Sequence, residues 1–269
     1  MSEAYRAFFG FERRPFPSNL PVSDILLTEE LSAAWNRFEY AVGMGAATLV
    51  TGEVGSGKST ALRYMLDRLH PSEYRYFSVT ATSGSILELY RQLLGEMGVE
   101  TASSSRAVLT GRIKKEIEEW VRNKKMKVLL VIDEASLLRL EVFKELHTLL
   151  QFDFDSDPIL PLVLAGQSNL VDKLSYRSSH PFASRIVGRS HLDGMDRETM
   201  EKYIDHRLSI AGTKTRIYDD AAITAIHQGS GGVFRKANHL ARGALVAAAL
   251  EKSTAVTAEH VRLASTELF

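Results

Sequence analysis

The chain has 269 residues and an ordinary globular composition, 45% hydrophobic and 25% charged, so it can bury a substantial core without cross-links. With 33 basic and 33 acidic residues, overall charge does not favour nucleic-acid binding, although a local basic face remains possible. The absence of cysteine excludes disulfides and cysteine-ligated zinc. Neither a signal peptide nor a membrane span is expected, which predicts a soluble, cytoplasmic protein.

Residues 1–27 form an aromatic and proline-rich strap, whose rings are expected to pack on the domain that follows. Apolar residues at helical spacing then extend from Leu31 to Val42 and predict a helix that ends at Gly43 and Gly45. We therefore expect the first folded domain to begin near residue 28.

A glycine-rich loop follows a short apolar run, residues 46–51, which predicts a buried parallel strand. The loop fits G-x-x-x-x-G-K-[ST] at every fixed position and precedes a helical stripe; its residues are Gly52, Glu53, Val54, Gly55, Ser56, Gly57, Lys58 and Ser59, with Thr60 next. Converging backbone N–H groups at a helix N-terminus bind phosphate. Lys58 is expected to reach the β- and γ-phosphates, and the Ser59 hydroxyl to ligate Mg²⁺. The pattern predicts ATP and Mg²⁺ as ligands, and part of the strap could also cover the adenine base.

The next segments predict a strand at residues 74–79, a helix at 86–97, a loop at 100–106 and a helix through 113–121. The last helix and the turn after it carry a run of basic residues, namely Arg112, Lys114, Lys115, Arg122, Lys124, Lys125 and Lys127. Three glutamates accompany them. A solvated face and a patch for DNA phosphates are both compatible with this pattern.

An apolar run from Val128 to Ile132 predicts a central strand buried on both faces. Asp133 and Glu134 follow at its carboxyl end, where open α/β sheets bind their ligands. Asp133 is expected to hold Mg²⁺, directly or through water, and Glu134 to polarise the attacking water.

After a helix near residues 142–150, residues 159–165 predict a fourth buried strand. Gln167 follows this strand and lies near the γ-phosphate if the strand neighbours the phosphate loop; alternatively it only caps the next helix. A fifth strand is predicted at residues 186–192, with Arg185 and Arg189 flanking its first half. Either arginine is an ordinary surface residue or a finger that reaches a phosphate held by a neighbouring subunit.

From about residue 195 the pattern becomes helical, with helices expected near residues 196–211, 219–228, 233–251 and 257–267. Arg235 falls in the first turn of the third of these helices, where a cation opposes the helix dipole. We therefore expect it to contact a phosphate anion, with a structural salt bridge as the alternative.

These residues resemble the AAA+ ATPases of the ExeA type, a group shared by general-secretion ATPases and transposon-encoded ATP-binding helpers. The resemblance spans nearly the whole chain. It rests on Phe8-Phe9-Gly10-Phe11 with Pro15-Phe16, the loop at residues 52–60, LLVIDEA at 129–135, LVLAGQ at 162–167, Tyr203-Ile204-Asp205-His206-Arg207-Leu208 with Ala211-Gly212, and Arg235 with Asn238.

The resemblance implies an α/β P-loop core, residues 28–194, with a five-stranded parallel sheet of order 5-1-4-3-2, and a small all-helical lid, residues 195–269. It implies that Gln167 is the sensor-1 residue, Arg185 the finger and Arg235 the sensor-2 arginine. The expected machinery comprises Lys58, Glu134 and Arg185 as catalytic residues, residues 52–60 with Gln167 and Arg235 around ATP, and Ser59 and Asp133 around Mg²⁺.

The expected activity is ATP hydrolysis by a homo-oligomer, because a finger from a neighbour makes turnover depend on assembly. Three roles remain open. The chain, which ends at Phe269, suits a DNA-binding transposition helper that recruits or regulates a transposase. A general-secretion ATPase in envelope assembly and a nucleotide-gated scaffold with little turnover are the alternatives.

Overall fold

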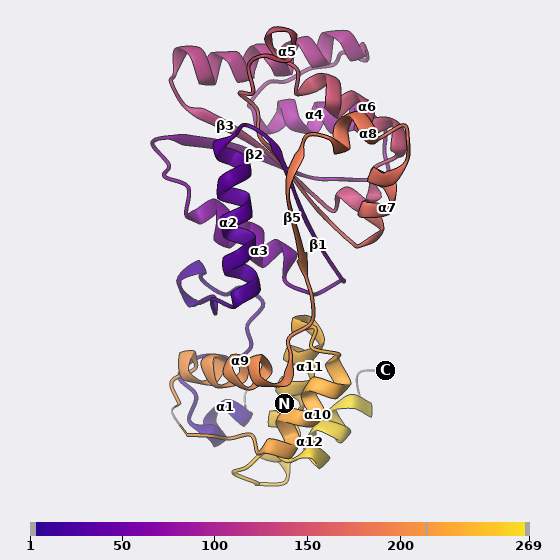
Figure 1. Ribbon diagram of the computed structural model, residues 1–269. Helices are drawn as coiled ribbons and strands as arrows, with labels where there is room; N and C mark the ends of the chain where they lie inside the picture. Colours follow the sequence, from indigo (N-terminus) through magenta and orange to yellow (C-terminus); the bar gives the residue numbers. More distant parts are fainter. Residues whose placement is uncertain (1–3, 214, 267–269) are drawn as a thin grey trace. The chain divides into compact units, whose positions relative to one another are not determined.

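The computed structural model describes residues 4–213 and 215–266 (Figure 1). Two compact units emerge from its internal contacts, one formed by residues 29–54 and 58–192, the other by residues 1–28, 55–57 and 193–269. We call them the sheet unit and the helical unit. The first three residues of the expected strap, and residues 267–269 at the end of the expected lid, lie outside the described residues.

The sheet unit contains a five-stranded parallel sheet of order β2-β3-β4-β1-β5, which confirms the predicted order. Its strands are β1 (Ala47–Gly52), β2 (Tyr74–Thr80), β3 (Lys127–Asp133), β4 (Leu162–Gly166) and β5 (Ile186–Leu192). The central strands β1, β3 and β4 are almost entirely buried and mostly apolar, because a strand covered on both faces needs apolar side chains on both. Parallel order brings the carboxyl ends of these strands to one edge of the sheet.

Seven α-helices of the sheet unit flank these strands (Figure 1): α2 (Glu29–Gly43), α3 (Lys58–Asp67), α4 (Ile86–Glu96), α5 (Arg106–Glu118), α6 (Leu140–Leu149), α7 (Asn169–Ser175) and α8 (His180–Ala183). Each predicted apolar stripe faces the core, as Leu89, Ile113 and Leu146 illustrate by being buried. Strand β4 begins at Leu162 and not at Ile159 as expected. Pro158 and Pro161 occupy the approach to the strand and have no N–H for a ladder hydrogen bond.

The helical unit contains α9 (Arg197–Ile210), α10 (Asp220–Ser230), α11 (Phe234–Leu250) and α12 (Ala258–Thr266). Asp196 and Asp219 cap α9 and α10 by accepting hydrogen bonds from the N–H groups of Thr199 and Ala222. Tyr218 crosses the core of this unit, and its hydroxyl donates to the Ala241 carbonyl (2.8 Å). These contacts give the helices a core of their own.

The strap packs in the helical unit, so the expectation that its rings cover the sheet domain is wrong. The strap contains α1 (Ala4–Phe9) and the short helix Val22–Asp24. Tyr5, Phe11 and Phe16 are buried in one cluster with side chains of α9 to α12. Arg207 and Arg242 donate to the carbonyls of Pro17 and Phe16. Burial lowers the pKa of Arg207, whose guanidinium lies against the rings of Phe16 and Tyr203.

The turn between α2 and β1 offers a matched pair of glycines for a stability test. Gly45 has φ of 66°, and a Cβ there would lie 1.7 Å from the Pro158 carbonyl oxygen, whereas a Cβ at Gly43 would meet nothing within 4 Å. We expect Gly45→Ala to lower the free energy of unfolding by about 2 kcal/mol or more, from left-handed strain plus the clash. Gly43→Ala should be neutral or raise it by about 0.5 kcal/mol. Chemical denaturation of both variants measures the difference, and equal stabilities would contradict this account of the turn.

Candidate functional site

The glycine-rich loop joins β1 to α3 and has the shape of a phosphate cradle. Gly55 and Gly57 have φ of 88° and 98°, which only glycine adopts without strain and which lets successive N–H groups converge. Ser56 is buried, and its Oγ has no hydrogen-bond partner among the described residues. A buried hydroxyl without a partner is unfavourable unless a ligand satisfies it. The loop therefore fits a bound phosphate group.

Lys58 begins α3, and its ammonium folds back over the loop. Its Nζ donates to the carbonyl oxygens of Gly52 (3.0 Å) and Glu53 (2.7 Å), and the residue is only 7% exposed. A buried ammonium held by carbonyl dipoles, with the positive end of a helix beside it, attracts anions strongly. This arrangement places the charge of Lys58 at the mouth of the loop.

Ser59 and Asp133 come from different elements and meet. Ser59 lies in the first turn of α3 and Asp133 at the end of β3, yet the Ser59 Oγ donates to Asp133 Oδ2 (3.1 Å). A hydroxyl and a carboxylate at this distance suit Mg²⁺, which takes few protein ligands and completes its shell with phosphate oxygens and water. Within the described residues, no group of three or more His, Asp or Glu side chains offers an all-protein metal cage.

Glu134 has a backbone conformation that the sequence did not reveal. It follows β3 with φ of 51° and ψ of 32°, the left-handed region, and its N–H donates to Asp133 Oδ1 (2.8 Å). Such strain in a non-glycine residue often accompanies a functional position. The Asp133 carboxylate is thus engaged by both the Ser59 hydroxyl and the Glu134 N–H.

Gln167 follows β4, which pairs with β1, so the condition set for this residue holds. Gly166, the residue before it, is in register with Thr51, the residue directly before the loop. The Gln167 carbonyl accepts from the N–H of Leu170 in α7, so any capping role belongs to its backbone. Gln167 is half-buried, and its position directly after β4 puts the residue at the edge of the sheet where the phosphate loop begins.

The Arg185 side chain is engaged by two residues of its own chain. Its Nη2 pairs with Asp155 Oδ1 (2.5 Å), and its Nε donates to His147 Nδ1 (3.0 Å). The side chain is only 20% exposed. Neither partner could be inferred from sequence, because Asp155 and His147 lie 30 and 38 positions away. To act as a finger, Arg185 has to leave both of them. Arg189, on β5, is exposed.

The basic run on α5 and the following turn is largely used inside the sheet unit. Lys114 donates to the Gln151 carbonyl (2.6 Å), and burial lowers its pKa. Arg122 pairs with Asp157 (3.1 Å). These contacts favour the interpretation as a solvated, internally paired face over a patch for DNA phosphates.

Arg235 lies in the first turn of α11, as expected. It is exposed, and its backbone N–H donates to the carbonyl oxygen of Gly55 (3.2 Å), which belongs to the same compact unit. The cation therefore stands at a helix N-terminus without stabilising that helix.

Comparison with known families and with curated proteins finds relatives of this chain. Residues 45–174 match the AAA domain family. The chain is also 28% identical over 266 residues to general secretion pathway protein A of Aeromonas hydrophila, covering 98% of this chain and 48% of the relative. It therefore spans about half the length of that relative.

Solved structures share the fold at low sequence identity. The ORC2 protein of Aeropyrum pernix, in ADPNP and ADP complexes, gives a TM-score of 0.70 at 16% identity, over 96% of this chain and 72% of that one. RuvB of Thermotoga maritima, described as a Holliday junction branch migration motor, gives 0.56 at 20% identity, over 94% and 72%. At these identities the likeness shows the fold alone. No helix in the described part of the chain is long and apolar enough to span a membrane.

Proposed function

We propose that this chain, an AAA+ protein of the ExeA type, binds ATP with Mg²⁺ and hydrolyses it to ADP and phosphate. The observation that carries the proposal is the contact between Ser59 and Asp133 (3.1 Å) at the start of the helix that follows the phosphate loop. Ser59 and Asp133 lie 74 positions apart in the sequence, yet the fold brings the two side chains into hydrogen-bond contact.

In the proposed site, the amides of residues 52–60 and the Lys58 ammonium hold the triphosphate. Ser59 and Asp133 would hold Mg²⁺, which when bound supplies positive charge to the β- and γ-phosphate oxygens. Glu134 accepts a hydrogen bond from the attacking water and so aligns it with the γ-phosphate. The preset dipoles of the loop stabilise the charge that develops on the ADP leaving group.

Three further residues complete the proposal. Gln167 orients the γ-phosphate, Arg235 contacts the triphosphate, and Arg185 of a neighbouring copy acts as the finger after leaving Asp155 and His147. In functional terms the domains are the strap, residues 1–27, the nucleotide-binding core, residues 28–194, and the lid, residues 195–269. The working form would be a cytoplasmic homo-oligomer.

For the biological role, we propose a DNA-binding transposition helper that recruits or regulates a transposase. The proposal draws on structural neighbours whose descriptions name DNA, including the ORC1 protein of Aeropyrum pernix, whose structure was solved in complex with DNA. The second candidate is a secretion-type ATPase in envelope assembly, which the name of the Aeromonas relative favours. A scaffold with little turnover is the third.

One assay separates these roles. The ATPase rate is measured with and without duplex DNA at two salt concentrations, while light scattering records particle size. A helper should be stimulated by DNA, and its DNA affinity should fall steeply with salt because phosphate contacts release counterions. Indifference to DNA with sustained turnover indicates the secretion role. Negligible turnover under every condition indicates the scaffold and removes the hydrolysis proposal.

A further inference from the structure

A surface turn of the sheet unit presents an aromatic ring to solvent under backbone strain. Phe154 is fully exposed (105%), whereas Leu250, the next most exposed large apolar side chain among the described residues, is 70% exposed. Asp153, Phe154 and Asp155 have φ of 44°, 54° and 74°, three consecutive left-handed residues without a glycine. Each such residue is disfavoured in its own right. Neither solvation nor local backbone preference explains this turn.

The turn is nevertheless firmly braced. The Ser156 Oγ donates to the Asp153 carbonyl (2.7 Å), and the Asp155 N–H donates to the Phe152 carbonyl (2.9 Å). The carboxylate of Asp155 is held by Arg185. Strain that is maintained by several independent contacts points to a role for the strained residue. Here the strain accompanies a phenyl ring that is exposed to solvent and has an aspartate on either side of it in the sequence.

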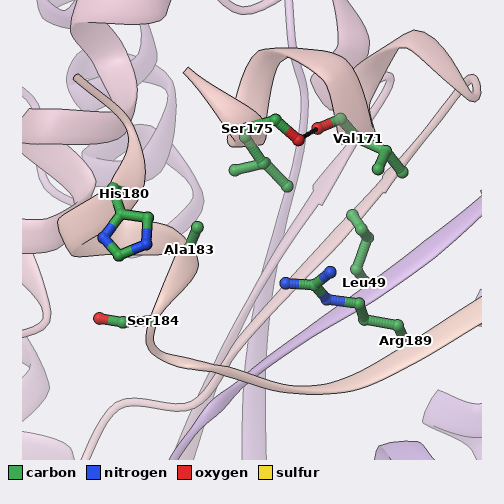
Figure 2. Close-up of a pocket in the computed structure, with 8 residues that line it drawn as sticks. Leu49, Val171, Ser175, His180, Ala183, Ser184 and Arg189 are labelled. Carbon is green, nitrogen blue, oxygen red and sulfur yellow. Dashed lines mark hydrogen bonds between the residues drawn. The ribbon is translucent and has the colours of Figure 1, made fainter. Parts of the chain in front are cut away.

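A pocket of the same unit has complementary chemistry (Figure 2). Its volume is about 400 Å³, it lies against the sheet beside α7 and α8, and Leu49, Leu174 and Ala183 supply apolar walls. His180, Ser184 and Arg189 add polar groups. Arg189 is exposed, and it has no ion pair among the described residues. The pocket therefore suits an apolar side chain with a negative charge beside it.

We propose that the turn at residues 153–155 of one copy docks in this pocket of a second copy. Phe154 fills the apolar part, and Asp153 pairs with Arg189. Turn and pocket adjoin, because Ser184 lines the pocket and the next residue, Arg185, holds Asp155. In two copies related by a two-fold axis, the turn of each copy can therefore enter the pocket of the other, which makes the contact self-complementary. A buried aromatic anchor in a pocket is the usual centre of such an interface. The contact involves neither the phosphate loop nor Asp133, and it keeps Arg185 paired with Asp155, so it is distinct from the proposed finger contact.

Phe154→Asn tests the anchor while sparing the fold. Asparagine tolerates the left-handed region, so the melting temperature of the variant should be unchanged or higher. Self-association, measured by sedimentation without nucleotide, should weaken by about tenfold or more, the effect of losing an anchor residue. Tyr40→Gln removes another exposed aromatic, on α2 and 60% exposed, and serves as the matched control with unchanged association. A wild-type chain that stays monomeric, or a Phe154→Asn chain that associates like wild type, overturns the proposal.

Charge reversal and cross-linking test the partner. Arg189→Glu and Asp153→Arg should each weaken self-association, and a mixture of the two variants should form a mixed complex. Because the natural chain lacks cysteine, Asp153→Cys mixed with Ser184→Cys should form an intermolecular disulfide. A control pair of Asp153→Cys with Ser104→Cys, an exposed serine elsewhere in the unit, should not. If both cysteine pairs cross-link to the same extent, the turn does not occupy the pocket. The same follows if the mixture of Arg189→Glu and Asp153→Arg chains forms no mixed complex.

Discussion

Lys58→Ala should abolish ATP hydrolysis and weaken ATP binding by about 100-fold or more. The ammonium lies at the mouth of the phosphate loop, 2.7 Å from the Glu53 carbonyl, and can transfer its hydrogen bonds to phosphate oxygens. Two charge-assisted hydrogen bonds of about 1.5 kcal/mol or more each correspond to that loss of affinity. Calorimetric titration with Mg·ATP measures binding, and phosphate release measures turnover.

The control for this variant is Lys115→Ala, which removes an exposed lysine from α5 of the same unit. It should bind and hydrolyse ATP like the wild type. Thermal unfolding of both variants without nucleotide shows whether the sheet unit remains folded. Wild-type turnover in a folded Lys58→Ala chain would remove the loop from the mechanism.

Glu134→Gln should retain ATP while hydrolysis falls about 10²- to 10⁴-fold, the usual contribution of a general base. Glutamine preserves the size of the side chain and the hydrogen bond from the backbone N–H to Asp133, but it cannot accept a proton from water. The ATP affinity should change little, because Ser59 and Asp133 remain in contact. Single-turnover chemistry and equilibrium titration measure the two effects separately.

Glu141→Gln is the matched control, since Glu141 is an exposed acid in the first turn of α6. Its turnover should equal that of the wild type. If Glu134→Gln loses binding and hydrolysis in equal measure, Glu134 is needed for the ground state and not for water activation.

Much of the fold follows from patterns that report directly on burial. A run such as Val128–Ile132 has no polar face, so only a strand covered on both sides accommodates it. The strap shows the limit of this reasoning. Its rings are buried as their composition suggests, but composition does not say against which partner, and Tyr5 and Phe16 pack with the helices of the other unit.

In the candidate site, too, some contacts could be predicted from the sequence and others could not. The contact between Ser59 and Asp133 was predictable, because the loop motif and the acidic end of β3 each carry a known chemical preference. The contacts of Arg185 with Asp155 and His147 were not predictable, since they depend on how distant segments of the chain fold together. Backbone strain at Glu134 and Phe154 likewise leaves no mark in composition or periodicity.

The most direct test of the central claim is a crystal structure of the chain with Mg²⁺ and a non-hydrolysable ATP analogue. We expect the phosphates to lie on the amides of residues 52–59, with the metal ion between Ser59 and Asp133 and the Glu134 carboxylate facing the γ-phosphate. An analogue bound elsewhere, or phosphates on the loop with Asp133 turned away from the metal, would contradict the account.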